Sequence, residues 1–209
     1  MKTSCTVSAL LMAALPATAL AAPDNLDQWN ASTSTDHTWP ISALMGDDVI
    51  AGDNTEVGSV TDVVLSDQGT ISSLVVRSNG NAVDAGYYQV EWPVKLFEPG
   101  DVVLSIDATP EAFARMTPLD NPADAVGDNH YLASRLLGMG VEVEGRAWGE
   151  VENLIVSDDQ KVSSVVIAED GVNSVDYWIP TSFGWINAQQ VMVVPYARAD
   201  IESGNGYME

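Results

Sequence analysis

Paired carboxylates are the side chains of this sequence that could do the most chemistry. Glu142 and Glu144 stand two residues apart in one expected strand, and Glu150 and Glu152 stand two apart in the next. Because alternate side chains of a strand share a face, each pair is expected to point one way. The four carboxylates then form either a cluster that binds a hard cation such as Ca²⁺ through oxygen ligands, or a solvated acidic face, which is the usual outcome of a charge run.

Other reactive groups are few. His37 and His130 are the two histidines, and they are too isolated in the sequence for a metal site or an acid–base pair. Cys5 is the one cysteine and lies near the N-terminus. The sequence has no calcium-loop order, P-loop, G-x-G-x-x-G or Ser-His-Asp signature. We therefore expect no catalytic residue, no metal ligand, no cofactor and no enzymatic activity, and a hydrolase built on a carboxylate pair is the weakest alternative.

Asp62 is an acidic residue in unusual surroundings. The strand expected over 56–65 alternates, so that Asp62 shares one face with Val60 and Val64. A carboxylate among core valines must be hydrogen-bonded, because an unpaired one is costly to bury. We predict that Asp62 accepts backbone N–H groups of a neighbouring turn. Asn153, at the matching place in a second copy of the pattern, would keep this role without the charge.

The charge balance excludes several classes of protein. Thirty Asp and Glu against eight Lys and Arg give a formal charge of −22, while 46% of the residues are hydrophobic. That hydrophobic content excludes a disordered acidic tail, and the shortage of cations excludes nucleic acid as a partner. The acids are spread over the whole chain, which indicates a surface adapted to high salt, a halophilic pattern, with weak cation binding as the alternative.

The N-terminal segment is typical of a secretory signal. Lys2 precedes an apolar run, and Ala19-Leu20-Ala21 has the A-x-A pattern of a cleavage site, so 1–21 is predicted to be a signal peptide cleaved near Ala21. The run is shorter than the roughly 20 apolar residues of a spanning helix, and no transmembrane segment is expected in the mature chain. Cleavage would leave a periplasmic or extracellular chain without cysteine, and hence without thiol or zinc–thiolate chemistry. Residues 22–40 form an aperiodic polar lead-in, which predicts flexibility.

Two copies of one β-rich pattern follow the lead-in. Gly46 matches Gly138 at an offset of 92 residues, and Gly58 matches Gly149 at an offset of 91. In each copy, short runs rich in Val, Ile and Leu alternate with Gly, Asp and Asn turns, which is typical of short β-strands. In the first copy a hairpin turn is expected at 66–69. The strands expected there are 49–51, 56–65, 70–76, 86–92 and 102–106.

The pattern predicts an all-β chain with two tandem small domains, 41–107 and 131–197. The linker, 108–130, begins with Thr109-Pro110-Glu111, a cap, a proline and an acid that favour a short helix. Residues 198–209 are expected to be a C-terminal tail.

The first copy contains a short series of motifs. They are Gly46 and Val49, then Gly58-x-Val60-x-Asp62-Val63, an apolar strand after a polar turn, and Val90-Glu91-Trp92-Pro93. In these residues the first copy resembles the PRC-barrel domain, a small β-barrel. The second copy keeps Gly138, Gly149 and Pro180 but has Asn153 for Asp62. The resemblance implies two PRC-barrel-like β-barrels joined by a linker with a short helix. The membrane helix and the RNA-related domain of some family members are missing, so their functions are not implied.

Apolar residues that have no obvious cover suggest contact surfaces. Strand ends at 63–64 and 154–155 are apolar on both faces, so the other copy, a protein partner or a second molecule must cover them. Trp148, Trp178 and Trp185 have no tryptophan counterpart in the first copy. We consider them possible partner contacts, and Trp178 either contacts a partner or fills the core.

These observations predict an exported, non-enzymatic PRC-barrel protein. It would mediate protein–protein interaction or assembly in the cell envelope, through an unidentified partner or through self-association. An acidic module that binds a cation of the Ca²⁺ type is the alternative from another class.

Overall fold

The computed structural model describes ten segments of the chain. The predicted signal peptide, nearly all of the lead-in, Pro93 and Trp185 lie outside them. In the described part, no helix is long and apolar enough to cross a membrane. The segments are 38–51, 55–80, 84–91, 104–106, 109–127, 129–157, 159–170, 176–180, 186–204 and 206–207.

The first half forms a sheet, here called the first sheet, in the order β5-β4-β3-β2-β6. All its pairings are antiparallel except that of β2 with β6. The described bounds of all five strands lie within two residues of the predicted ones, and β4 ends two residues beyond its predicted end. The turn expected at 66–69 is present, with the Gly69 N–H donating to the Ser66 carbonyl at 3.0 Å. The strands are β2 (Asp48–Ala51), β3 (Glu56–Ser66), β4 (Ile71–Ser78), β5 (Tyr87–Glu91) and β6 (Leu104–Ile106).

The second half forms the second sheet, which repeats this topology. Its order is β12-β8-β9-β10-β11, again with one parallel pair, β12 with β8, and β13 adds to β11. In each sheet, the two strands at the ends of this order do not pair with each other. The described strands therefore form open sheets rather than closed barrels. The strands are β8 (Gly140–Val143), β9 (Arg146–Ser157), β10 (Val162–Glu169), β11 (Asp176–Pro180), β12 (Met192–Val194) and β13 (Gly206–Tyr207).

In the described part of the chain, short helices lie between the strands in the sequence. The helix predicted in the linker is present, because the Thr109 hydroxyl accepts the Ala112 N–H at 3.2 Å and Pro110 occupies the first turn. Residues 198–209, predicted to be a tail, contain a helix and β13. The helices are η1 (Ile41–Ala43), α2 (Pro110–Phe113), η2 (Pro122–Ala125), α3 (Ala133–Leu136) and α4 (Arg198–Gly204).

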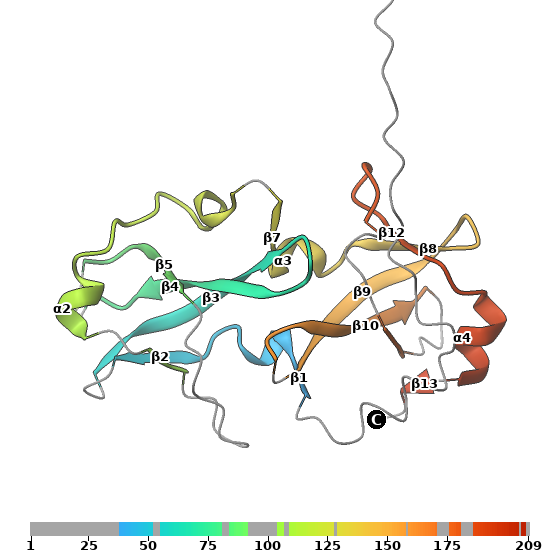
Figure 1. Cartoon of the computed structure of the whole chain (residues 1–209), viewed down its shortest axis with the longest axis horizontal. Helices are drawn as coiled ribbons and strands as arrows, with labels where there is room; N and C mark the ends of the chain where they lie inside the picture. Colours follow the sequence, from blue (N-terminus) through green and yellow to red (C-terminus); the bar gives the residue numbers. More distant parts are fainter. Residues whose placement is uncertain are drawn as a thin grey trace, which may run out of the picture.

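The two halves exchange the strands that precede them. Strand β1 (Thr38–Pro40) comes before the first sheet but pairs with β9 of the second, and β7 (His130–Leu132) comes before the second sheet but pairs with β3 of the first. Figure 1 shows β7 and α3 beside β3, and β1 beside the β9–β10 hairpin. The halves are therefore interlocked through a reciprocal exchange.

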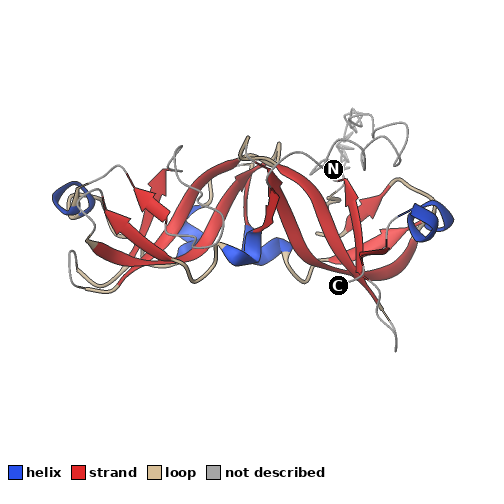
Figure 2. Cartoon of the chain, turned by 90° about the horizontal axis from the view of Figure 1, so that it is seen from below, coloured by secondary structure: helices blue, strands red, loops and turns tan. Residues whose placement is uncertain are grey.

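The tips of two hairpins join the sheets in the same reciprocal way. The Ile71 N–H donates to the Gln160 carbonyl, and the Val162 N–H donates to the Gly69 carbonyl, each at 2.9 Å. Ile71 and Val162 are equivalent residues, as are Gly69 and Gln160, so the two bonds are related by the internal repeat. Figure 2 shows the two sheets meeting at the centre of the elongated molecule.

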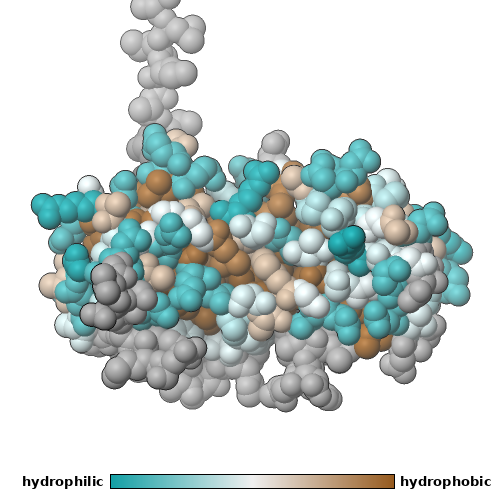
Figure 3. All heavy atoms as spheres, turned by 180° about the vertical axis from the view of Figure 1, so that it is seen from behind, coloured by the Kyte–Doolittle hydropathy of each residue, from teal (hydrophilic) through white to brown (hydrophobic). Residues whose placement is uncertain are grey.

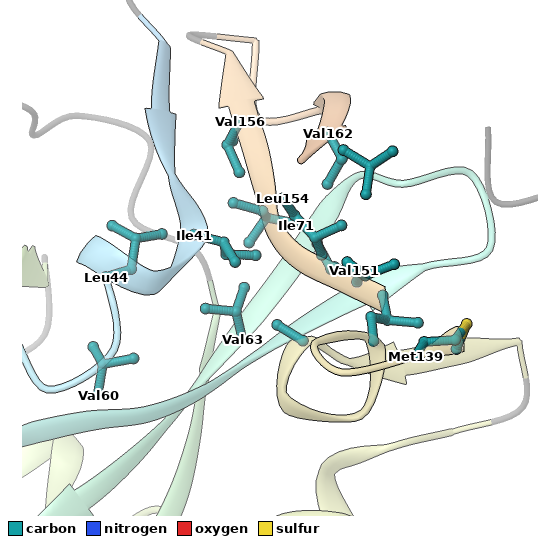
Figure 4. Packing of buried hydrophobic residues seen from close by; sticks show 14 of the residues in the cluster. Ile41, Leu44, Val60, Val63, Ile71, Met139, Val151, Leu154, Val156 and Val162 are labelled. Atoms are coloured by element: carbon teal, nitrogen blue, oxygen red, sulfur yellow. The ribbon is translucent and has the colours of Figure 1, made fainter. Parts of the chain in front are cut away.

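One hydrophobic core runs through both sheets. Its buried members come from both halves, and Ile41 and Leu136, on the exchanged turns, are both fully buried in it. Figure 3 shows hydrophobic residues gathering near the middle of one face among hydrophilic ones. Figure 4 shows Ile41 of η1 lying between Val63 of β3 and Leu154 of β9. Of the three covers considered for the apolar strand ends, namely the other copy, a protein partner and a second molecule, the structure shows the other copy at Val63 and Leu154.

A β-bulge interrupts the alternation predicted along β3. The register with β4 shifts between Val60 and Asp62, where the extra residue is Thr61 of β3, and again between Val64 and Leu65, where the extra residue is on β4. Val60 consequently lies in the main core, whereas Val64 lies in a small second cluster on the opposite face. The prediction that Val60 shares a face with Asp62 and Val64 is therefore wrong, because a bulge adds one residue to a strand of period two.

Candidate functional site

Asp62 fixes the exchanged turn of the other half to the first sheet. It is 3% exposed, and its Oδ1 accepts the Val63 N–H at 2.8 Å and the Ser134 N–H at 3.1 Å. Its Oδ2 accepts the Ser134 hydroxyl. The prediction that this carboxylate binds backbone N–H groups of a neighbouring turn is confirmed. The turn is α3, which follows the exchanged strand β7.

Asn153 makes the matching contact in the second sheet. Its Oδ1 accepts the Leu154 N–H at 3.0 Å and the Ser42 N–H at 3.3 Å, and its Nδ2 donates to the Ser42 hydroxyl at 2.7 Å. The amide oxygen thus keeps both backbone bonds of the carboxylate, and the amide group reverses the direction of the bond to serine. These two residues act as structural links between the halves.

The motif glycines serve the backbone. A Cβ on Gly58 would lie 2.1 Å from the Arg77 carbonyl oxygen, and one on Gly149 would lie 2.0 Å from that of Ala168. Only glycine allows the neighbouring strand to approach so closely. Gly46 and Gly138 have φ of 93° and 78°, in the left-handed region that favours glycine.

The tryptophans singled out from the sequence have different positions. Trp148 is 4% exposed and stacks at a tilt on Tyr177 with ring centroids 4.9 Å apart, so the prediction that it contacts a partner is wrong. Trp178 is half-buried and its indole N–H donates to the Ser164 hydroxyl. Its role as a contact stays a prediction, and Trp185 lies outside the described residues. Pro93 is also outside them. Pro180, matched to Pro93 in the sequence, is buried at the end of β11 opposite Ser164, whereas the residue in the equivalent place of the first sheet is Glu91, opposite Ser73.

The carboxylates 142, 144, 150 and 152 do not align as expected. Glu144 has φ of 53° and lies in the turn between β8 and β9, so it does not share a strand face with Glu142. The register places Glu142 opposite Ala147, and Glu150 opposite Gly140. Within the described segments, no three His, Cys, Asp or Glu side chains are grouped so as to hold a metal ion.

A groove of about 650 Å³ lies over the outer face of the first sheet, beside β5. We call it the β5 groove. Gln89 ties the overlying η2 to the sheet, because its Nε2 donates to the Ser73 hydroxyl at 2.9 Å and to the Ala125 carbonyl at 3.2 Å. Sequence reasoning did not find this groove, because residues far apart in the chain form it. The lining residues are Ser72, Ser73, Gln89, Glu91, Asp124, Ala125, Val126, Gly127 and His130.

The β5 groove is polar and carries negative charge. Glu91 on the sheet and Asp124 on η2 are exposed carboxylates in its lining. Asp124 also closes a capping box, in which its Oδ2 accepts the Asn121 N–H at 3.0 Å. Glu91 makes no such structural contact in the described part of the chain. The groove suits a ligand that brings cations and backbone hydrogen-bonding groups.

A comparison of the sequence with models of known protein families finds a match in the first half of the chain. Residues 40–113 match the family model of the PRC-barrel domain. This segment of the chain is a PRC-barrel domain. The match begins at Pro40, the last residue of β1, and ends at Phe113, the last residue of α2. The helix of the linker therefore belongs to the PRC-barrel domain, where Phe113 packs on Tyr88 with ring centroids 5.0 Å apart.

The second half is similar to the PRC-barrel domain in structure. It has the same strand order, the same parallel pair, and glycines at the same close approach of two strands. The chain matches no curated protein.

Proposed function

We propose that this PRC-barrel protein is an exported, non-enzymatic interaction module, and that its β5 groove binds an extended segment of another protein in the cell envelope. The observation that carries the proposal is that, in both sheets, a further segment of the chain bonds to the edge strand. The Leu119 N–H donates to the Tyr87 carbonyl on β5 at 2.7 Å. At the equivalent place on β11, Tyr207 of β13 pairs with Asp176.

Beyond Tyr87, the residue that bonds to Leu119, β5 has further residues along the same edge. Gln89 and Glu91 are the next residues of β5 that share an orientation with Tyr87, and both line the β5 groove. An extended peptide that pairs with a sheet edge gains affinity from main-chain hydrogen bonds, and specificity from pockets for its alternate side chains. The groove offers such a pocket beside the edge.

Charge defines the kind of peptide that this groove prefers. Glu91 and Asp124 face the bound segment within a protein of formal charge −22. Lys or Arg side chains on the peptide would complement both carboxylates, and acidic peptides would be repelled. We therefore propose a partner that offers an extended segment with at least one basic residue.

Selection from a library of displayed peptides tests the proposal. Peptides selected on the mature protein should be extended and rich in Lys or Arg, and Glu91→Lys should weaken their binding about tenfold. Glu111→Lys makes the same charge change on exposed α2, outside the groove, and serves as the matched control. The proposal fails if no peptide binds, or if both substitutions weaken binding equally.

Export is tested separately by N-terminal sequencing of the protein recovered from the envelope and the medium of its native host. A mature N-terminus at Ala22 is expected from the Ala19-Leu20-Ala21 pattern. Recovery of the chain only in the cytoplasm with its first 21 residues intact would contradict export.

A further inference from the structure

The outer face of the second sheet differs from its counterpart in the first sheet. Its apolar residues are Pro40 on β1, Ile155 on β9, Val166 on β10 and Trp178 on β11, and Asn153 and Ser164 lie on the same face. The register places Pro40 opposite Ile155 and Val166 opposite Trp178. The equivalent residues of the first sheet are Leu132, Val64, Val75 and Gln89, with Leu132 opposite Val64 and Val75 opposite Gln89.

In the first sheet, the chain itself covers this face. Val64, Val75 and Leu132 form a hydrophobic cluster with Ala125 of η2. Leu119, Ala123 and Val126 pack against the same cluster. All the covering residues belong to 119–126, the segment that immediately precedes the exchanged strand β7.

In the second sheet, no hydrophobic cluster of the described residues corresponds to this cover. Ile155 is 5% exposed yet belongs to neither described hydrophobic cluster. Val166 and Trp178 are half-buried, and Pro40 is exposed. Apolar residues gathered on the outer face of a sheet indicate that another segment or molecule covers them.

The internal repeat indicates which segment this occupant is. Strand β1 has the place on the second sheet that β7 has on the first, and the segment before β7 covers the first face. The segment before β1 is 22–37, the predicted lead-in, and its two large apolar residues are Leu26 and Trp29. We propose that residues 22–37 fold back over the outer face of the second sheet, where Leu26 and Trp29 pack against Val166 and Trp178.

The length of the lead-in is sufficient for this path. Sixteen residues in extended conformation reach about 50 Å, whereas crossing from β1 over β9 and β10 to β11 needs about 15 Å at the usual strand spacing. The segment enters the sheet at β1, directly beside Ile155, so its last residues already start at the edge of the face. The proposal concerns another surface than the β5 groove and is independent of the proposed function.

Disulfide trapping tests the proposal, because the mature chain contains no cysteine of its own. The pair Ala31→Cys and Val166→Cys should form a disulfide within one molecule on mild oxidation at low protein concentration. The control pair Ala31→Cys and Ser59→Cys places the second thiol on the first sheet and should stay reduced. Equal oxidation of both pairs, or of neither, overturns the proposal, and so does a disulfide between two molecules, which would identify a second copy as the occupant.

Deletion of residues 22–36 gives a second measurement on a chain that keeps β1. Amides of β10 and β11 should exchange hydrogen at least tenfold faster than in the mature protein, while those of β4 and β5 stay unchanged. Peptide binding in the β5 groove should also stay unchanged. Unaltered exchange in β10 and β11 would overturn the proposal.

Discussion

Asp62 and Ser134 are joined by two hydrogen bonds, one to the serine N–H at 3.1 Å and one to its hydroxyl. Asn153 and Ser42 repeat this relationship in the opposite direction between the halves. At this position of the repeat, an Asp side chain in the first sheet and an Asn side chain in the second therefore hold the exchanged turn in the same way.

Asp62→Asn is expected to be tolerated, because Asn153 already shows that an amide makes the same set of contacts. The free energy of unfolding should fall by less than about 1 kcal/mol, whereas Asp62→Ala should lower it by about 2–3 kcal/mol by leaving the buried Val63 N–H and the part-buried Ser134 N–H without an acceptor. Urea unfolding of the three proteins measures this. Equal losses for the two variants would contradict the role assigned to Asp62.

Gly58→Ala is expected to lower the free energy of unfolding by at least about 2 kcal/mol, since the added methyl group would meet backbone atoms that no side-chain movement can relieve. Gly149→Ala should have a similar effect. Gly140→Ala is the control, because a Cβ there meets nothing within 4 Å. Thermal unfolding compares the three variants, and a loss at Gly140 as large as that at Gly58 would contradict the explanation.

Asp47 makes the stability depend on pH. Burial raises its pKa above the ordinary 3.8, with a smaller contribution from the charge of Asp48, and its Oδ2 has no hydrogen-bond partner among the described residues. A raised pKa in the folded state means that the stabilising contribution is complete below the unfolded pKa and is lost as the pH rises through the folded one. Asp47→Asn should therefore stabilise the protein at neutral pH by up to about 1 kcal/mol, with the gain disappearing below the ordinary pKa.

Thermal unfolding across this pH range checks the Asp47 prediction. Asp48→Asn removes the same charge from the adjacent exposed residue and should produce a smaller gain at neutral pH. A gain that persists unchanged in acid would contradict the assignment to ionisation of Asp47.

Ile41→Ala is expected to destabilise the half of the protein to which it does not belong. Ile41 is fully buried between the sheets, so its truncation should cost about 2–5 kcal/mol and accelerate hydrogen exchange in β9. Phe113→Ala is the control, because Phe113 packs on Tyr88 of the first sheet. Faster exchange confined to the first sheet in both variants would contradict a shared core.

Salt should stabilise this acidic protein. Raising NaCl from about 0.1 M to about 1 M shortens the screening length from roughly 10 Å to 3 Å, so repulsion between surface carboxylates decreases and the melting temperature rises. CaCl₂ at matched ionic strength should do no more. A larger rise with millimolar Ca²⁺ would favour the cation-binding alternative instead.

The parts of the structure that local patterns determine could be predicted. Gly46 and Gly58, with their matches in the second copy, located the repeat, and the strands of the first sheet followed from short apolar runs between turns. Asp62 was interpretable because a carboxylate among valines must be hydrogen-bonded, and Asn153 indicated that the acceptor matters more than the charge.

The parts that depend on distant contacts could not be predicted. The exchanged strands β1 and β7 have three residues each, too few to show a periodic pattern, and their partners lie elsewhere in the chain. The bulge in β3 cannot be recognised from the composition of the strand. Trp148 was considered a partner contact because the first copy has no matching tryptophan, and its contact with Tyr177 joins β9 to β11, which are distant in the sequence and lie on either side of β10 in the sheet.

The pairing of β1 with β9 has a consequence for the time course of folding. Thr38 is among the first described residues to be synthesised, and its partner Ser157 comes only after the whole first sheet and the linker. Closing so long a loop before its contacts form is slow, as in other chains of high contact order. The first sheet also waits for β7 to cover Val64. Neither half completes its surface until most of the polypeptide has appeared, so an incomplete chain stays in an open state.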